Sequence, residues 1–87
     1  MTDDDREYLV RLVEAERRDA RVRYEALRGE MLALDRRADA AELDPRMSGY
    51  ERTQIKRQLV LSTNHAETAR ARLRRAEGVL ERLKGAT

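Results

Sequence analysis

Apolar and small residues recur along the chain in alternating steps of three and four, in two runs separated by a polar stretch. This spacing places them on one face of a helix and is typical of the a and d positions of a coiled coil. The first run is Val10, Val13, Arg17, Ala20, Tyr24, Leu27, Met31, Leu34, Ala38 and Ala41. The second run is Ile55, Leu59, Ser62, Ala66, Ala69, Leu73, Ala76, Leu80 and Leu83. The pattern predicts two long helices, each with one narrow apolar seam.

The two runs match each other when the chain folds back between them. Val10 then meets Leu83 and Leu27 meets Ala66, and the residue numbers of every such pair add up to 93. Large side chains mostly face small ones, which keeps two helices close with few voids. The sequence therefore predicts an all-α fold in which two long helices form an antiparallel coiled-coil hairpin, a single unit from residue 1 to residue 87.

The ends of the first helix are marked by local signals. Thr2 and Asp5 have the spacing of a capping box, with Asp in the position that Glu or Gln usually takes. Asp44 precedes Pro45, and a residue before proline is disfavoured in the helical conformation. We therefore expect the first helix over about residues 3–43.

A second capping box opens the returning helix. Ser48 and Glu51 have the S-x-x-E spacing, so the helix is expected over about residues 49–84, after a turn over residues 44–48. Gly85 is the expected C-terminal cap. At about 1.5 Å per residue, each helix is about 50–60 Å long.

The composition suits such a hairpin better than a globular domain. Charged residues make up 41% of the chain and aromatic residues 3%, with no Phe or Trp, which leaves too little material for a globular core. The formal net charge is only +2, so it indicates neither an acidic nor a basic partner. The absence of Cys excludes a disulfide framework and a thiolate zinc site.

The sequence also lacks the marks of a membrane protein and of an enzyme. Its first residues are acidic and polar, unlike a signal peptide, and no apolar run reaches membrane-spanning length. The lone His65 is expected to form a weak surface pair with Glu30. No nucleophile set, phosphate loop or cluster of metal ligands is visible. We expect a soluble, cytoplasmic, non-enzymatic protein without a cofactor or metal.

Three acidic residues gather where the first helix ends. They are Asp39, Glu42 and Asp44. The C-terminus of a helix carries partial negative charge and prefers basic residues, so acids there are not explained by helix stability. The functional interpretation is a partner-binding tip. The alternatives are a turn preference of Asp44 before Pro45 and simple solvation, with arginines close enough to neutralise the acids.

Arginines form a belt around the middle of the predicted hairpin. They are Arg17, Arg18, Arg21, Arg23, Arg28, Arg70, Arg72, Arg74 and Arg75. The register is expected to place Arg21 opposite Arg70 and Arg23 opposite Arg72. Like charges across a coiled-coil flank are unfavourable, which favours an anionic partner, an acidic protein surface rather than nucleic acid. The alternative is a solvated flank neutralised by neighbouring acids.

Several apolar residues lie off the seam. At the open base of the hairpin they are Tyr8, Leu9, Leu12 and Val79, and nearer the tip Leu32 and Val60 share one flank. The base residues are candidates for contact with a second copy in a four-helix bundle or with another partner. Scattered apolar surface residues are the alternative.

The turn and the returning helix carry motifs that resemble a known family. The residues are Asp44-Pro45, then Tyr50-Glu51-Arg52 with Gln54, then Val79-Leu80-Glu81-Arg82-Leu83 with Gly85. This run resembles the second coiled-coil arm of actinobacterial-type DksA/TraR proteins, which bind RNA polymerase. In those proteins the helix leads into a four-cysteine zinc finger. This chain has no cysteine and ends at Thr87, so it is expected to be a fragment or a protein without the finger.

The resemblance implies a function in transcription. Family members push the tip of the coiled coil into the secondary channel of RNA polymerase, and by position Asp39, Glu42 and Asp44 would be the tip acids. The alternatives from the residues themselves are a homodimeric adaptor, scaffold or chaperone-like protein and, more weakly, nucleic-acid binding through the arginine belt.

Overall fold

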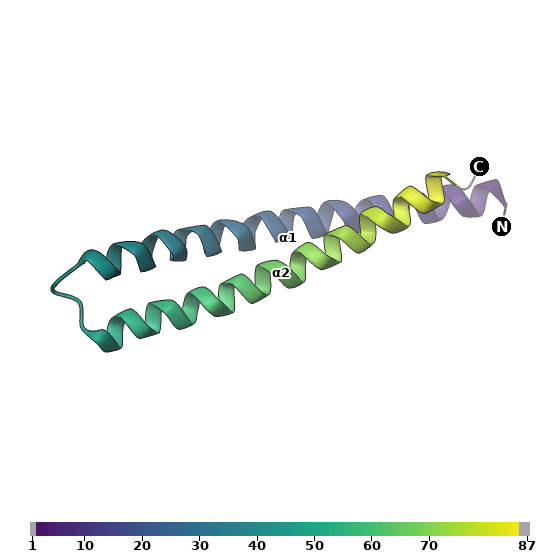
Figure 1. Cartoon of the computed structure of the whole chain (residues 1–87). Coiled ribbons are helices and arrows are strands. Elements are labelled where there is room, and N and C mark those ends of the chain that lie inside the picture. The colour runs from purple at the N-terminus through teal and green to yellow at the C-terminus, as the bar shows by residue number, and fades with distance from the viewer. Residues whose placement is uncertain (1, 86–87) are drawn as a thin grey trace.

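The computed structural model describes residues 2–85 and contains two helices, α1 over Asp3–Leu43 and α2 over Gly49–Gly85. They lie antiparallel and coil around each other along their length (Figure 1). The backbone extends over 65 × 15 × 13 Å along its principal axes. The predicted all-α antiparallel hairpin is therefore confirmed.

The helix ends follow the local signals in the sequence. The side chain of Thr2 accepts a hydrogen bond from the backbone N–H of Asp5 at 3.1 Å, and so caps α1. Asp44 has an extended backbone, as its place before proline predicts. At the other end α2 includes Gly85, and no glycine within residues 2–85 has a positive φ. The prediction that Gly85 caps the helix from outside is therefore wrong.

Burial follows the predicted seam. Every buried residue in the described range belongs to the two heptad runs: Ala20, Ala38 and Ala41 on α1, and Ile55, Ser62, Ala66, Ala69, Leu73, Ala76 and Leu80 on α2. The larger α1 seam residues, such as Tyr24 and Met31, are only half-buried, whereas Leu73 and Leu80 of α2 are buried. The seam is thus narrow along its whole length.

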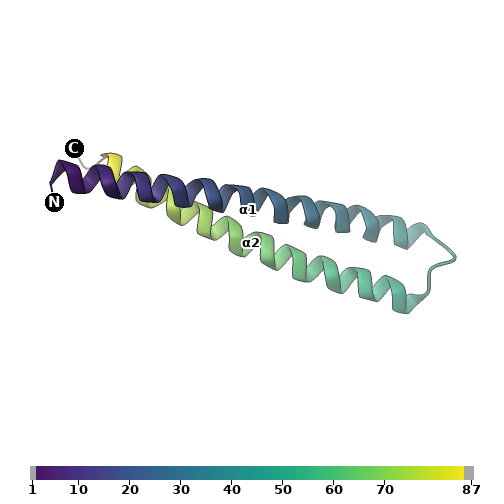
Figure 2. The same cartoon turned by 180° about the vertical axis from the view of Figure 1, so that it is seen from behind.

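The two ends of the hairpin differ. Near the turn, Ala38, Ala41 and Ile55 form a buried cluster, with Met47 and Leu59 packed against it. At the base, the first turns of α1 extend beyond the end of α2, as two opposite views show (Figures 1 and 2). The tip is therefore closed, whereas the base is open. Over the described residues, neither helix has a stretch apolar enough to cross a membrane.

Candidate functional site

The tip begins with a tight turn over Asp44, Pro45, Arg46 and Met47. The backbone N–H of Met47 donates to the carbonyl oxygen of Asp44 at 3.3 Å, with proline in the second position, where its fixed φ favours a turn. The carboxylate of Asp44 also accepts a hydrogen bond from the backbone N–H of Arg46 at 2.9 Å. The turn preference of aspartate therefore accounts for Asp44 at this position.

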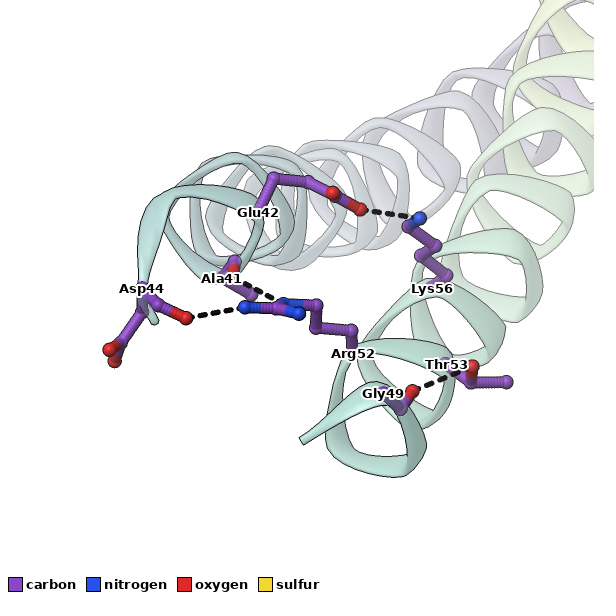
Figure 3. Close-up of polar contacts among 7 residues, drawn as sticks. All are labelled: Ala41, Glu42, Asp44, Gly49, Arg52, Thr53 and Lys56. Carbon is purple, nitrogen blue, oxygen red and sulfur yellow. Dashed lines mark hydrogen bonds and ion pairs between the residues drawn. The ribbon is translucent and has the colours of Figure 1, made fainter. Parts of the chain in front are cut away.

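Arg52 ties the two helices together at the turn. Its Nε donates to the carbonyl oxygen of Ala41 at 2.9 Å, and its Nη2 donates to that of Asp44 (Figure 3). These oxygens lie at the C-terminal end of α1, where carbonyls lack helical partners and the helix dipole favours a positive charge. One side chain of α2 thus caps α1.

Sequence reasoning gave Arg52 no such role, although a signal was present. The second heptad run begins at Ile55, and one further step of three reaches Arg52. In the register of the seam, Arg52 then faces Ala41, as the structure shows. Extending the second heptad run by one step from Ile55 toward the turn would have located Arg52.

The start of α2 is fixed by the predicted capping residues. The Oγ atom of Ser48 accepts from the backbone N–H of Glu51 at 3.1 Å and donates to the Glu51 carboxylate at 3.2 Å. The reciprocal contact thus runs through the serine hydroxyl rather than through the backbone N–H of a standard capping box. Both helix ends at the tip are therefore held by side-chain hydrogen bonds.

The three tip acids lie at the same end but in different environments. Glu42 forms an ion pair with Lys56 across the hairpin (Figure 3). The hydrogen bond and the charge of Lys56 hold the pKa of Glu42 below its ordinary value. Asp39 is exposed and makes no ion pair with any residue from 2 to 85. The structure thus agrees with the turn preference given above as the alternative for Asp44, and the pair with Lys56 gives Glu42 a structural role as well.

Two large apolar side chains at the tip were not singled out from the sequence as site residues. Leu43 is 85% exposed and Tyr50 is 74% exposed, one at the end of α1 and the other in the first turn of α2. They flank the turn on either side. The sequence did carry a signal for both residues, since each is an apolar residue next to a helix boundary and outside the heptad runs.

Part of the arginine belt lines a shallow groove of about 270 Å³. Arg23, Arg72, Arg75 and His65 surround a floor that includes Ala69. Arg23 and Arg72 thus line one groove, but the ion pair that Arg72 makes across the hairpin is with Glu16, so the structure does not bear out the prediction that Arg23 lies opposite Arg72. Arg72 also lies 3.7 Å from the carboxylate of Glu16, which neutralises part of this charge.

The other flank also differs from the prediction. Arg21 shares a groove with Glu77, whereas Arg70 shares one with Arg28 and Glu67. Arg21 and Arg70 are therefore not facing partners. Ion pairs on this flank join Glu14 to Lys84 at 3.1 Å and Glu42 to Lys56.

The reason lies in the direction of the side chains. Helical side chains lean toward the N-terminus of their own helix, so on this flank of an antiparallel pair they meet a partner displaced from the seam register. Moving one heptad inward from Glu14 and Lys84 leads to Arg21 and Glu77, which are of opposite charge. Of the remaining belt members, Arg17 is half-buried in the seam, and Arg18 and Arg74 are exposed.

The base residues are exposed to different degrees. Leu9 and Val79 are half-buried, whereas Tyr8 is 61% and Leu12 is 50% exposed. Nearer the tip, Leu32 and Val60 are both exposed. Tyr8 and Leu12 thus present apolar surface to solvent at the base.

Comparison with protein-family models, curated proteins and solved structures finds no match to this chain. The likeness to the DksA/TraR family therefore stays a prediction from its short motifs.

Proposed function

We propose that the hairpin is a non-enzymatic regulator of transcription that binds bacterial RNA polymerase and inserts its tip into the secondary channel. The observation that carries the proposal is the shape, a rod with a closed end whose backbone extends over 65 × 15 × 13 Å. Such a rod is long enough to reach a recessed centre and thin enough to enter a narrow channel. The motif likeness to the DksA/TraR family supports the choice of partner.

The construction of the tip supports the proposal as well. Arg52 caps α1, and Glu42 pairs with Lys56 across the hairpin, so the tip is held together from both helices. A probe whose end is ordered before binding loses less conformational entropy when it docks. The tip also presents two acidic groups to a partner. Asp39 is exposed, and the carboxylate of Asp44 points away from both helices (Figure 3).

The proposal is tested by capture of purified bacterial RNA polymerase on the immobilised chain. The informative variant is Asp39→Asn combined with Asp44→Asn. An asparagine at position 44 keeps the side-chain oxygen that accepts from the N–H of Arg46, so the charge is removed while the turn hydrogen bond is retained. We expect at least a tenfold weaker capture by this variant, with unchanged helicity by circular dichroism.

A matched control removes two exposed acids at the opposite end, Asp4→Asn with Glu81→Gln. This control should capture polymerase as well as the parent chain. Equal loss in both variants would indicate a general effect of charge and contradict tip insertion. Lack of capture by the parent chain would contradict the choice of partner.

A further inference from the structure

The outer face of α1 carries a second heptad ladder, on the opposite side of the helix from the seam. It starts at Tyr8 and proceeds in alternating steps of four and three to Leu43. We call these positions the outer stripe. Leu12 and Val22 are its other large apolar members, and Ala15, Ala26, Gly29, Ala33 and Ala40 are its small ones. A helix with apolar ladders on two faces has the pattern of a helix packed between two neighbours.

Only one of these faces has a neighbour in the hairpin. Val22 is 69% exposed, and the small members Ala26, Ala33 and Ala40 are exposed as well. No heavy atom of a neighbouring residue lies within 4 Å of the place where a Cβ of Gly29 would be. The stripe is therefore an open, mostly flat track along the length of α1.

The equivalent outer positions of α2 are different. They carry the polar and charged residues Gln54, Arg57, Asn64, Thr68, Arg75 and Arg82, which interrupt the apolar Tyr50, Leu61 and Ala71. The outer face of α1 is thus the more continuously apolar of the two.

We propose that the outer stripe binds the outer stripe of a second copy of this chain, with the two α1 helices antiparallel about a two-fold axis. The stripe is complementary to itself in one register, in which the residue numbers of each pair add up to 55. The pairs are Leu12 with Leu43, Ala15 with Ala40, Asp19 with Arg36, Val22 with Ala33, and Ala26 with Gly29. Each pair occurs twice, as a two-fold interface requires.

The charged members identify the register. Asp19 and Arg36 are the only charged residues of the stripe, and both are exposed. Neither makes an ion pair with a residue of the described range 2–85. In the proposed register each Asp19 meets the Arg36 of the other copy, so both charges gain a partner of opposite sign.

The sizes of the side chains agree with the same register. At the two-fold axis Ala26 meets Gly29, which allows the two backbones to approach closely. Val22 meets Ala33 on either side of the axis, so a larger side chain packs against a smaller one. The outer ends are closed by Leu12 against Leu43, the largest apolar pair. A helix of another protein would not be expected to match this order, which is why the occupant is a second copy.

Cysteine cross-linking tests the register, because the chain has no cysteine of its own. Leu12 and Leu43 lie 31 positions apart on one continuous helix, about 45 Å at 1.5 Å per residue, so they cannot be joined within one copy. A mixture of Leu12→Cys chains and Leu43→Cys chains should form a mixed disulfide dimer under mild oxidation. Either variant alone should give less than a tenth of that yield.

Strong cross-linking of one variant with itself would indicate a parallel pairing and overturn the register. No cross-link in the mixture, at a concentration where the parent chain sediments as a dimer, would place the interface elsewhere. If the parent chain sediments as a monomer even at a concentration 100-fold higher than that of the cross-linking experiment, the proposal as a whole is overturned.

Exchanging the charges at positions 19 and 36 distinguishes an effect on the dimer interface from an effect on the fold. In the Asp19→Arg variant, the new arginine of each copy lies opposite Arg36 of the other copy. The dissociation constant of the dimer, measured by sedimentation, should rise at least 100-fold. Adding Arg36→Asp restores opposite charges and should recover the dimer to within about threefold. Both variants should keep the helicity of the parent chain, because both residues are exposed and lie outside the seam. Failure of the double variant to recover the dimer would contradict the Asp19 to Arg36 contact.

Discussion

The tip and the base of the hairpin are built from the same heptad pattern but are held together differently. At the tip, Ala38, Ala41 and Ile55 are buried, and Arg52 caps one helix from the other. At the base, Val10, Val13 and Leu83 are only half-buried, although Leu80 is buried, and the start of α1 lies beyond the end of α2. The difference indicates that the turn and its polar contacts add to the seam in holding the tip together.

The largest expected effect is the loss of apolar packing at the tip. Ile55→Ala should lower the free energy of unfolding by about 2–4 kcal/mol, because Ile55 is buried and its removal leaves a cavity beside Ala38 and Ala41. Val10→Ala at the half-buried base should cost no more than about 1 kcal/mol. Urea unfolding followed by circular dichroism, at a concentration where the chain is monomeric, measures both. Equal losses would remove the distinction between the two ends.

The next effect concerns the cap from Arg52. Arg52→Ala should lower the free energy of unfolding by about 2 kcal/mol, since it leaves the carbonyls of Ala41 and Asp44 without their charged donor. Hydrogen exchange should accelerate at the tip and stay unchanged at the base. Arg57→Ala, at an exposed arginine five residues further along α2, is the matched control and should change neither quantity. Faster exchange along the whole hairpin would show that Arg52 is not a local cap.

A smaller change in the opposite direction is expected midway between the ends. The hydroxyl of Ser62 is buried in the seam and has no hydrogen-bond partner within residues 2–85. Ser62→Ala should therefore raise the free energy of unfolding by about 1 kcal/mol, which corresponds to a rise of about 4–8 °C in the melting temperature. Because both ends are untouched, the difference between them should persist. A lower melting temperature would mean that this hydroxyl has a stabilising role.

The smallest effect is the pH dependence of the pair between Glu42 and Lys56. The pKa of Glu42 is lowered in the folded chain, so the pair stabilises the hairpin above the ordinary pKa of 4.5 and loses this contribution as the pH falls through the lowered value. Titration of the Glu42 side chain by NMR should give a pKa below 4.5, and Lys56→Gln should return it to the ordinary range. An unchanged pKa in that variant would assign the shift to another group.

The proposed dimer and the proposed insertion of the tip should exclude each other. In the antiparallel register, Leu43 of each tip packs against Leu12 near the base of the other copy, which covers one side of the tip and thickens the rod. A disulfide-linked Leu12→Cys and Leu43→Cys dimer should therefore capture little polymerase until it is reduced. If the oxidised dimer captures polymerase fully, the side of the tip that the other copy covers does not take part in polymerase binding.

The periodicity of the sequence was sufficient to predict the two helices, their ends to within about one residue and the seam register. It was not sufficient for the flanks, because the partner of Arg21 depends on the direction in which its side chain leans and not on the seam register. Arg52 was assigned no capping role because the second heptad run was taken to begin at its first apolar member, Ile55, one step after Arg52. The free acid at position 39 was placed correctly at the tip, but its lack of a partner is visible only in the structure.

The central claim is that the tip, and not the base, enters the polymerase. The most direct test replaces the exposed Arg46 at the tip, or the exposed Arg82 at the base, by a photoreactive amino acid and maps the cross-links on RNA polymerase. We predict that position 46 cross-links to residues that line the secondary channel near the active centre, and that position 82 reaches only the outer rim. Cross-links from position 46 on the outer surface, or from position 82 inside the channel, would contradict the claim.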